Sequence, residues 1–200
     1  MTRMNASAVT FQSFSAKVHR VNYNNLFQST EEEDGTVRMH RDKKKNVTGI
    51  ADFSGKDERA VQFAGHTVKM FHPKANSVEV YDMSKYTHSM DQFLLLGFGI
   101  SGTELQKAYT VSMAGDETLG GVKTTRLQLV PKSAEVLKLF TKIELWIPAG
   151  QANPVQEKFT QKSGDYSLAR YTDLVINPNL PASAFELKLP AGVKIIQAGK

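Results

Sequence analysis

A glycine-rich segment is the first feature of the sequence whose residue types and spacing could do chemistry. The run GFGISG at residues 97–102 matches the G-x-G-x-x-G pattern of dinucleotide-binding loops, and it lies between an apolar run and a short helical pattern. A dinucleotide site also requires a βαβ unit on a parallel sheet, whereas the segments on both sides predict antiparallel hairpins. We therefore interpret Gly97, Gly99 and Gly102 as points where the chain bends between two short helices. A nucleotide-dependent enzyme that uses residues 97–102 stays open as the least favoured alternative.

The histidines and carboxylates form no second catalytic pattern. None of the five histidines has the helical spacing of a metal-binding pair beside a carboxylate. The sequence contains no cysteine and no G-x-S-x-G motif, which removes thiol chemistry, disulfides and the serine nucleophile elbow. The carboxylates of residues 31–33 lie in polar sequence, where nothing would shift their pKa values. The sequence therefore predicts no catalytic residues, no metal and no cofactor, and a protein that is not an enzyme.

The composition is that of one soluble globular domain that spans residues 1–200. Hydrophobic residues make up 40% of the chain, and 25 Lys and Arg against 20 Asp and Glu give a net charge of +5. No apolar run approaches the ~18 residues of a membrane-spanning helix. Residues 1–10 lack the apolar region of a signal peptide, so we expect a cytoplasmic protein or a mature form whose leader has been removed. The basic cluster at residues 38–45 follows an acidic run, so we expect no nucleic-acid binding.

Apolar and polar residues alternate along most of the chain, which is the pattern of β-strands with one apolar face. Short spacers with glycine, asparagine and aspartate separate the alternating runs, so we expect about ten or eleven strands in an antiparallel, meandering sheet. The fold class is therefore mainly β. The expected strands lie at residues 14–18, 37–39, 61–63, 68–70, 78–80, 127–129, 143–147, 155–159, 166–168 and 185–189. The expected helices are residues 103–108 capped by Ser101 or Thr103, residues 133–140 capped by Ser133, and a third in the poorly ordered stretch before Phe14.

The apolar faces of these strands exceed what two or three short helices can cover. This imbalance predicts an apolar cavity that could hold acyl chains, although the same residues could instead form an ordinary core under the helices. The strand residues that we expect to line the cavity are Phe14, Val18, Met39, Phe53, Phe63, Met70, Val80, Leu145 and Phe159. The residues that we expect to cover it as a lid are Phe93, Leu94, Leu96 and Phe98, with Gly97, Gly99 and Gly102 as hinges.

Four motifs, made up of six runs of residues, carry a resemblance to a known family. AGHTVKMFHP at residues 64–73 keeps the turn Gly65, the aromatic Phe71 and Pro73 of a family hairpin. FLLL at 93–96 followed by ELQK at 104–107 is similar to its pair of lid helices. LQLVP at 127–131 followed by IELWI at 143–147 is similar to its central strands, and PASAFELKLPAGV at 181–193 is similar to its closing signature. In these motifs, over about residues 35–196, the chain resembles the LolA-like family of outer-membrane lipoprotein carriers and lipoprotein-sorting proteins.

The resemblance implies an unclosed, strongly curved antiparallel β-barrel with a lid of short α-helices. It implies a monomeric periplasmic carrier, not integral to a membrane, that binds the acyl chains of lipoproteins and passes them towards the outer membrane. An inner-membrane ABC lipoprotein-releasing transporter and an outer-membrane receptor would be its partners. The family has an arginine that holds the lid, and Arg41 is its best positional match, although Asp42 rather than proline follows it. Two alternatives with the same fold are a carrier of a free lipid, such as a hopanoid or glycolipid, and a lipoprotein-sensing module.

Overall fold

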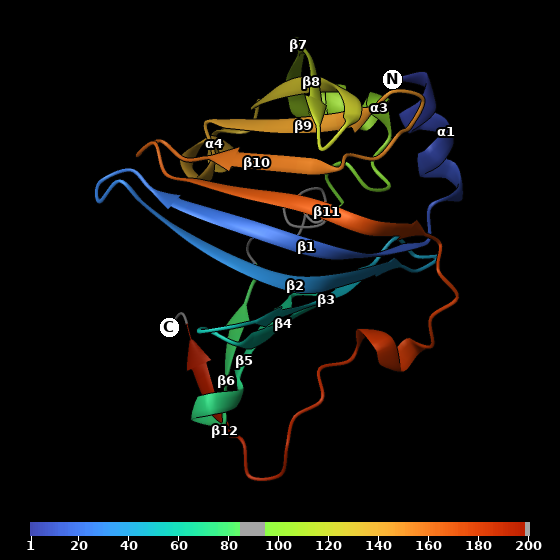
Figure 1. The fold of residues 1–200 in the computed structure, drawn as a ribbon. Coiled ribbons are helices and arrows are strands. Elements are labelled where there is room, and N and C mark those ends of the chain that lie inside the picture. The colour runs from blue at the N-terminus through green and yellow to red at the C-terminus, as the bar shows by residue number, and fades with distance from the viewer. Residues whose placement is uncertain (85–94, 199–200) are drawn as a thin grey trace. The chain divides into compact units, whose positions relative to one another are not determined.

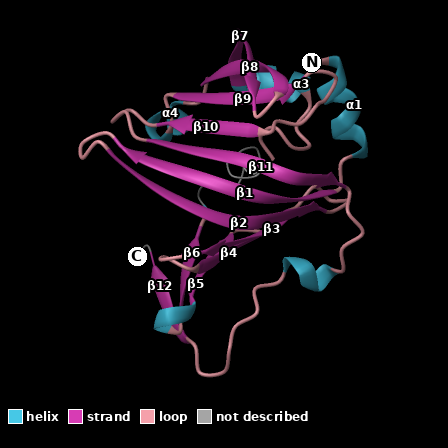
Figure 2. Ribbon diagram, viewed as in Figure 1, coloured by secondary structure: helices cyan, strands magenta, loops and turns pink. Residues whose placement is uncertain are grey.

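The computed structural model describes residues 1–84 and 95–198, and most of its secondary structure is β (Figure 2). The helices are α1 (Thr2–Thr10), α3 (Gly102–Ala108) and α4 (Ala134–Leu139), with the 3-10 turns η1 (Pro73–Ala75) and η3 (Ala182–Phe185). The strands are β1 (Ser13–Asn24), β2 (Ser29–Arg41), β3 (Val47–Ser54), β4 (Arg59–Ala64), β5 (Thr67–His72), β6 (Ser77–Asp82), β7 (Tyr109–Leu119), β8 (Val122–Pro131), β9 (Lys142–Pro148), β10 (Gln156–Thr160), β11 (Tyr166–Ile176) and β12 (Lys194–Ala198).

The twelve strands form one unclosed sheet, because β12 and β7 are its two edges. The strand order is β12-β6-β5-β4-β3-β2-β1-β11-β10-β9-β8-β7. The hairpin neighbours pair antiparallel, as the short turns predict, but β12 pairs parallel with β6. The mainly β class is therefore confirmed, with one strand more than the upper expected count.

Two compact units divide the chain, and each is described by itself. The first unit contains residues 1–11, 19–32 and 95–172, and the second contains residues 12–18, 33–94 and 173–200. In the first unit the strands β7 to β11 lie side by side, and α1 packs against α3 (Figure 1). In the second unit the strands β3 to β6 form a meander that β12 extends (Figure 1).

Helix α3 begins where the sequence predicts, and its cap is Ser101 rather than Thr103. The Ser101 hydroxyl accepts a hydrogen bond from the Glu104 backbone N–H at 3.1 Å, and the Glu104 carboxylate accepts one from the Ser101 N–H at 2.9 Å. This reciprocal pair satisfies two helix-terminal donors at once. Leu105 turns into the core with no exposed surface. The helix expected before Phe14 is also present as α1, in which Met4 is buried.

The strand expected at residues 185–189 is wrong. Residues 182–185 form the 3-10 turn η3, and the chain after Phe185 joins no strand. Prolines at positions 181 and 190 flank this stretch and cannot donate to a β-ladder. Instead, the Gln62 side chain donates to the Phe185 carbonyl oxygen at 3.0 Å, which fastens the segment across the sheet. The strands β3, β7 and β12 complete the sheet in its place.

Candidate functional site

One face of the second unit's sheet carries apolar side chains on strand after strand. The pairings Met39↔Gly49, Gly49↔Phe63 and Phe63↔Val68 place these residues on a single face, because directly paired residues point to the same side. We call this face the apolar face. Its apolar members are Val37, Met39, Val47, Ala51, Phe53, Val61, Phe63, Val68 and Met70.

The apolar face is buried along β3 and only half-buried along β5. Val47 and Phe53 are buried, whereas Phe63, Val68 and Met70 keep part of their surface exposed. The absence of a side chain at Gly49 leaves room for Met39, since a Cβ there would lie 2.9 Å from the Met39 Cγ. Four residues expected to line a cavity, Met39, Phe53, Phe63 and Met70, therefore share one face of the second unit.

Charged groups border the apolar face. The Arg59 guanidinium donates to both carboxylate oxygens of Glu33, at 2.7 and 2.9 Å, and lies 4.7 Å from the centre of the Phe53 ring. Further along the same face, Glu79 accepts a hydrogen bond from the Tyr81 hydroxyl. Arg41, the residue expected to hold the lid, pairs with Val47 and so belongs to this face. An apolar surface with charged borders is complementary to an amphipathic ligand, which has an apolar part and a polar part.

Three other expected lining residues have different positions. Val80 pairs with Lys69, so it points to the face opposite Met70 and does not join the apolar face. Phe14 and Val18 are both buried and share one side of β1. The alternation of Val78 and Val80 indicates a strand but not the face on which Val80 lies, and the register of β5 against β6 sets that face.

The first unit has its own buried face on strands β7 to β10. The pairings Leu129↔Ile143 and Ile143↔Phe159 place these three residues side by side across β8, β9 and β10. The pairing Leu145↔Glu157 places the next two residues of the same face beside each other. Leu129, Ile143 and Leu145 have no exposed surface, and Phe159 is half-buried. The expected lining residues Leu145 and Phe159 therefore share a face, in a unit separate from Met39 and Met70.

Two of the expected lid residues are buried in this first unit. Leu96 and Phe98 are almost completely buried, and the Phe98 ring meets the Tyr171 ring edge-on, with 5.2 Å between centroids. Phe93 and Leu94 lie outside the residues that the structure describes. The described part of the expected lid is thus a packed element of the first unit.

The glycines of this segment permit close packing that no other residue would allow. Gly97 and Gly99 have φ of +77° and +79°. A Cβ on Gly97 would lie 2.5 Å from the Pro154 side chain, and one on Gly99 would lie 2.3 Å from the Phe11 ring. Gly102 has an ordinary φ, and a Cβ there would lie 3.0 Å from the Met1 backbone. The bend that the glycine spacing predicts is therefore also a tight contact.

Substitution of Gly99 tests this contact. The Gly99→Ala variant is expected to lose about 3 kcal/mol or more of unfolding free energy, because left-handed strain and overpacking against Phe11 add together. Gly120→Ala is the control, since its φ is +54° but nothing lies within 4 Å of its Cβ position. Urea unfolding of both variants measures the difference, and equal losses would mean that backbone strain alone sets the cost.

Glu157 is a buried carboxyl that sequence reasoning missed. It keeps 4% of its surface exposed, and its Oε2 accepts a hydrogen bond of 3.1 Å from the Tyr171 hydroxyl. Its Oε1 has no hydrogen-bond partner in the described part of the chain and lies 2.7 Å from the Cβ position of Gly97. Burial raises the pKa of Glu157 to about 8, against its ordinary 4.5, although the Tyr171 hydrogen bond lowers it. The sequence does indicate that Glu157 is buried, because position 157 lies between Val155 and Phe159 on the apolar side of the alternating pattern.

The nearby tyrosines feel the same environment. Burial raises the pKa of Tyr109 to about 12, with a smaller contribution from the Glu157 charge. Burial also raises the pKa of Tyr171 well above its usual value, and Glu157 adds to this effect. At neutral pH the cluster of Glu157, Tyr109 and Tyr171 is therefore uncharged, which suits a buried face.

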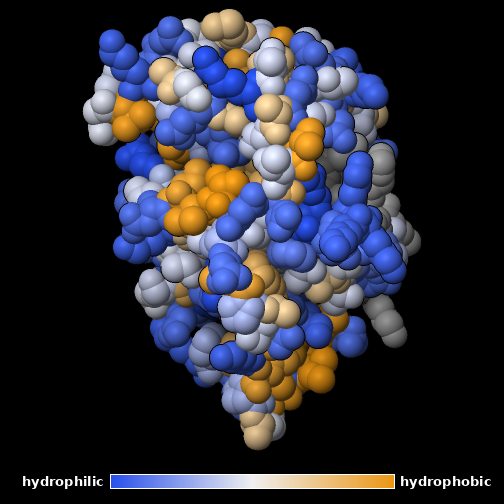
Figure 3. Space-filling model, turned by 90° about the vertical axis from the view of Figure 1, so that its right-hand side faces the viewer, coloured by the Kyte–Doolittle hydropathy of each residue, from blue (hydrophilic) through white to orange (hydrophobic). Residues whose placement is uncertain are grey.

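Metal-ligating side chains do not gather in groups of three or more within residues 1–84 and 95–198. In the same residues, no helix has the length and apolarity to cross a membrane. The side of the molecule in Figure 3 is mostly hydrophilic, with separate apolar patches.

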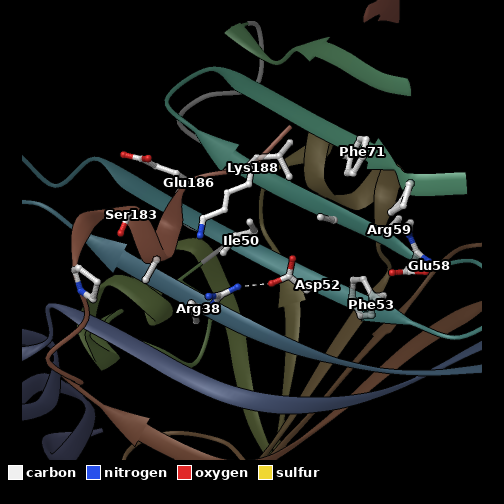
Figure 4. A pocket seen from close by; sticks show the side chains of 15 residues that line it. Arg38, Ile50, Asp52, Phe53, Glu58, Arg59, Phe71, Ser183, Glu186 and Lys188 are labelled. Atoms are coloured by element: carbon white, nitrogen blue, oxygen red, sulfur yellow. Dashed lines mark hydrogen bonds and ion pairs between the residues drawn. The ribbon is translucent and has the colours of Figure 1, made fainter. Parts of the chain in front are cut away.

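A pocket of about 460 Å³ in the second unit is lined mainly by residues of the opposite face of the sheet and by the chain after β11, with Phe53 and Arg59 also among its lining residues (Figure 4). Arg38 forms an ion pair with Asp52 at its floor, and Lys188 reaches towards them from the chain after β11 (Figure 4). Ile50 and Phe71 supply part of its apolar lining.

No family profile and no curated protein matches the chain. Solved structures do resemble it. An uncharacterized conserved protein from Thermus thermophilus has a TM-score of 0.58 at 10% identity, over 98% of this chain and 95% of that one. The Mycobacterium tuberculosis lipoprotein LppX has a TM-score of 0.53 at 13% identity, over 90% and 94%. The Pseudomonas aeruginosa MucA/MucB complex has a TM-score of 0.52 at 10% identity, over 94% of this chain and 59% of the matched one.

These likenesses show the fold alone. The chain has the LolA-like fold that its motifs predict, with an unclosed sheet of mostly antiparallel strands and few short helices. LppX, one of the similar structures, is itself a lipoprotein.

Proposed function

We propose that the protein is a periplasmic carrier that binds the acyl chains of lipoproteins and transfers them towards the outer membrane. The observation that carries the proposal is the apolar face, whose half-buried residues Phe63, Val68 and Met70 are bordered by the charged Glu33–Arg59 pair. Acyl chains would lie along the apolar residues, and the polar part of the lipoprotein would lie near the charged border. The LolA-like fold supports the same function.

Partial burial of the cargo fits a carrier better than complete burial. Each buried CH₂ contributes about 0.8 kcal/mol, so a sixteen-carbon chain buried in full would contribute ~12 kcal/mol. Burial of several chains at that strength would prevent release. A shallow, half-buried lining holds the cargo less strongly, and an open state within a few kcal/mol then permits transfer.

The proposal includes roles for the remaining residues and partners. Gly97, Gly99 and Gly102 would be hinges of the lid, and Arg41 would hold it. The carrier would act as a monomer between an inner-membrane ABC transporter and an outer-membrane receptor. A free lipid, such as a hopanoid or glycolipid, would fit the same apolar face, and the cargo analysis below separates the two.

The first experiment is native mass spectrometry of the purified protein, with solvent extraction of whatever it carries. A co-purified lipid or acylated peptide near one per chain is the expected result. Lipoprotein-derived peptides would identify the proposed cargo, and a free lipid alone would replace it. An unloaded mass, with no uptake of an added acyl probe, would overturn the proposal.

Substitutions on the two faces of the sheet then locate the site. The double variant Phe63→Gln with Met70→Gln is expected to weaken binding of a fluorescent fatty acid about tenfold or more, since each side chain loses part of its apolar contact. Val80→Gln is the matched control, because Val80 is also half-buried but points to the opposite face. Equal affinities for the double variant and the control would place the acyl site elsewhere.

A further inference from the structure

The turn between β1 and β2 exposes two large apolar side chains next to each other. Leu26 and Phe27 keep 81% and 75% of their surface exposed, although both side chains are strongly apolar. A single exposed leucine is ordinary on a protein surface, but an adjacent pair at the end of a hairpin is not. We call residues 25–28 the hairpin tip.

The hairpin tip is held in one conformation by its own hydrogen bonds. The Phe27 N–H donates to the Asn24 side-chain oxygen at 3.0 Å, and the Tyr23 hydroxyl donates to the Gln28 side-chain oxygen at 2.7 Å. The Gln28 amide in turn donates to the Asn25 carbonyl oxygen at 2.6 Å. Leu26 and Phe27 are therefore presented to solvent by an ordered turn.

The turn between β10 and β11 supports the tip from the side (Figure 1). The Asn25 N–H donates to the Asp165 carboxylate at 2.7 Å, and the Asn25 side chain donates to the Ser163 carbonyl oxygen at 2.9 Å. The Asn25 N–H and the Ser163 hydroxyl lower the pKa of Asp165 below its usual value, so this carboxylate stays charged and bonded at neutral pH. The support fixes the direction in which the two apolar side chains point.

Amphipathic side chains lie behind the tip. The rings of Tyr23 and Tyr166 stack with 4.9 Å between centroids, and the Lys158 ammonium lies 3.8 Å from the centre of the Tyr166 ring. Tyrosine and lysine side chains with an apolar body and a polar end are enriched where proteins meet the headgroup region of a bilayer. From the end of the hairpin inwards, the two apolar side chains therefore come first, and the aromatic and cationic side chains follow.

We propose that the hairpin tip contacts the surface of a phospholipid bilayer and inserts Leu26 and Phe27 at the boundary between headgroups and acyl chains. A narrow turn with two apolar side chains is too small for a stable protein interface, which buries about 1,200 Å² or more. It is sufficient for weak, reversible attachment to a bilayer, where each apolar side chain adds to the affinity independently. Exposed Glu31 and Glu32 follow the tip, so we expect a preference for zwitterionic over anionic bilayers.

The test is sedimentation of the purified protein with vesicles of phosphatidylcholine and phosphatidylethanolamine. The Leu26→Ser/Phe27→Ser variant is expected to bind these vesicles at least about tenfold more weakly than wild type. The matched control is Val9→Ser/Leu139→Ser, which removes side chains of 84% and 58% exposure from α1 and α4. The control is expected to bind as wild type does. No sedimentation of the wild type, or equal loss in both double variants, would overturn the proposal.

A fluorescence measurement tests the insertion itself. Phe27→Trp places an indole at the tip, and its emission is expected to shift to shorter wavelength and to be quenched by vesicles with brominated acyl chains. Unchanged emission in the presence of vesicles would overturn the insertion. The inference does not depend on the proposed function, because uptake of a soluble fatty-acid probe without vesicles is expected to be the same in the Leu26→Ser/Phe27→Ser variant as in wild type. Loss of probe uptake and loss of vesicle binding are thus separate results.

Discussion

Stability of the Glu157→Gln variant is expected to fall less than that of the wild-type protein as the pH is raised. Glu157 has a pKa of about 8 in the folded protein and about 4.5 when exposed to water, so the folded state holds the proton more tightly. Below the lower value both states are protonated, and the carboxyl has no effect on stability. Between the two values the unfolded chain releases its proton first, which favours unfolding by about 1.4 kcal/mol per pH unit. Above the higher value the effect no longer grows.

Glutamine at this position retains the acceptor for the Tyr171 hydroxyl but cannot ionise. The two proteins are therefore expected to unfold with similar free energies near about pH 5, and the variant is expected to be several kcal/mol more stable near about pH 9. Urea unfolding at a series of pH values measures the difference, in which the titration of every other group cancels. Parallel curves for the two proteins would show that Glu157 does not hold its proton in the folded state.

Loss of the Arg59 guanidinium is expected to destabilise the protein by about 3–5 kcal/mol, because it removes the guanidinium that forms the ion pair with the nearly buried Glu33 carboxylate. The Arg59 side chain is 9% exposed and that of Glu33 is 13% exposed. The side-chain hydrogen bond with Glu33 raises the pKa of Arg59 above its usual value. Arg59→Met keeps much of the apolar volume of the side chain, so the expected loss comes mainly from the lost ion pair.

A second substitution separates the charge from the packing. Arg59→Met with Glu33→Gln is expected to recover most of the lost unfolding free energy, because the double variant removes both charges of the nearly buried ion pair. Lys17→Met is the control, since the Lys17–Asp173 ion pair is about two-thirds exposed and is expected to change stability little. Thermal and urea unfolding report the result. If the double variant were as unstable as Arg59→Met, packing against Phe53 would be the main contribution of Arg59.

The fold was predictable because its main signals are local. Alternation identifies most strands, glycine-containing spacers identify the hairpins, and Ser101 with Glu104 has the spacing of a capping box. The parallel pairing of β12 with β6 was not predictable in this way. It depends on where residues 177–193 carry the chain, and no local pattern encodes that path.

The candidate site was predictable only in part, because a face of a sheet depends on register. Val78 and Val80 alternate as expected, but the pairing of Val80 with Lys69 sets them on the face away from Met70. Arg59 and Glu157 were missed because charged residues are ordinarily exposed. Both stand at positions where the alternation calls for an apolar residue, beside Val61 and Phe159 respectively. A charged residue at an alternating position that is otherwise occupied by apolar residues is therefore the sequence pattern that could have identified Arg59 and Glu157.

The place of β1 between β2 and β11 has a consequence for how the chain acquires its structure. The Ser13 N–H donates to the Asn177 side chain, 164 positions away in the sequence, and β11 is the neighbour of β1 in the sheet. A growing or newly delivered chain can pair β1 to β6 as local hairpins, but one edge of β1 stays open until residues near 176 arrive. Contacts so distant in sequence slow folding and prolong the exposure of that edge. Refolding intermediates are therefore expected to associate through β1, and a chaperone that shields this strand would speed refolding more than one that shields β7.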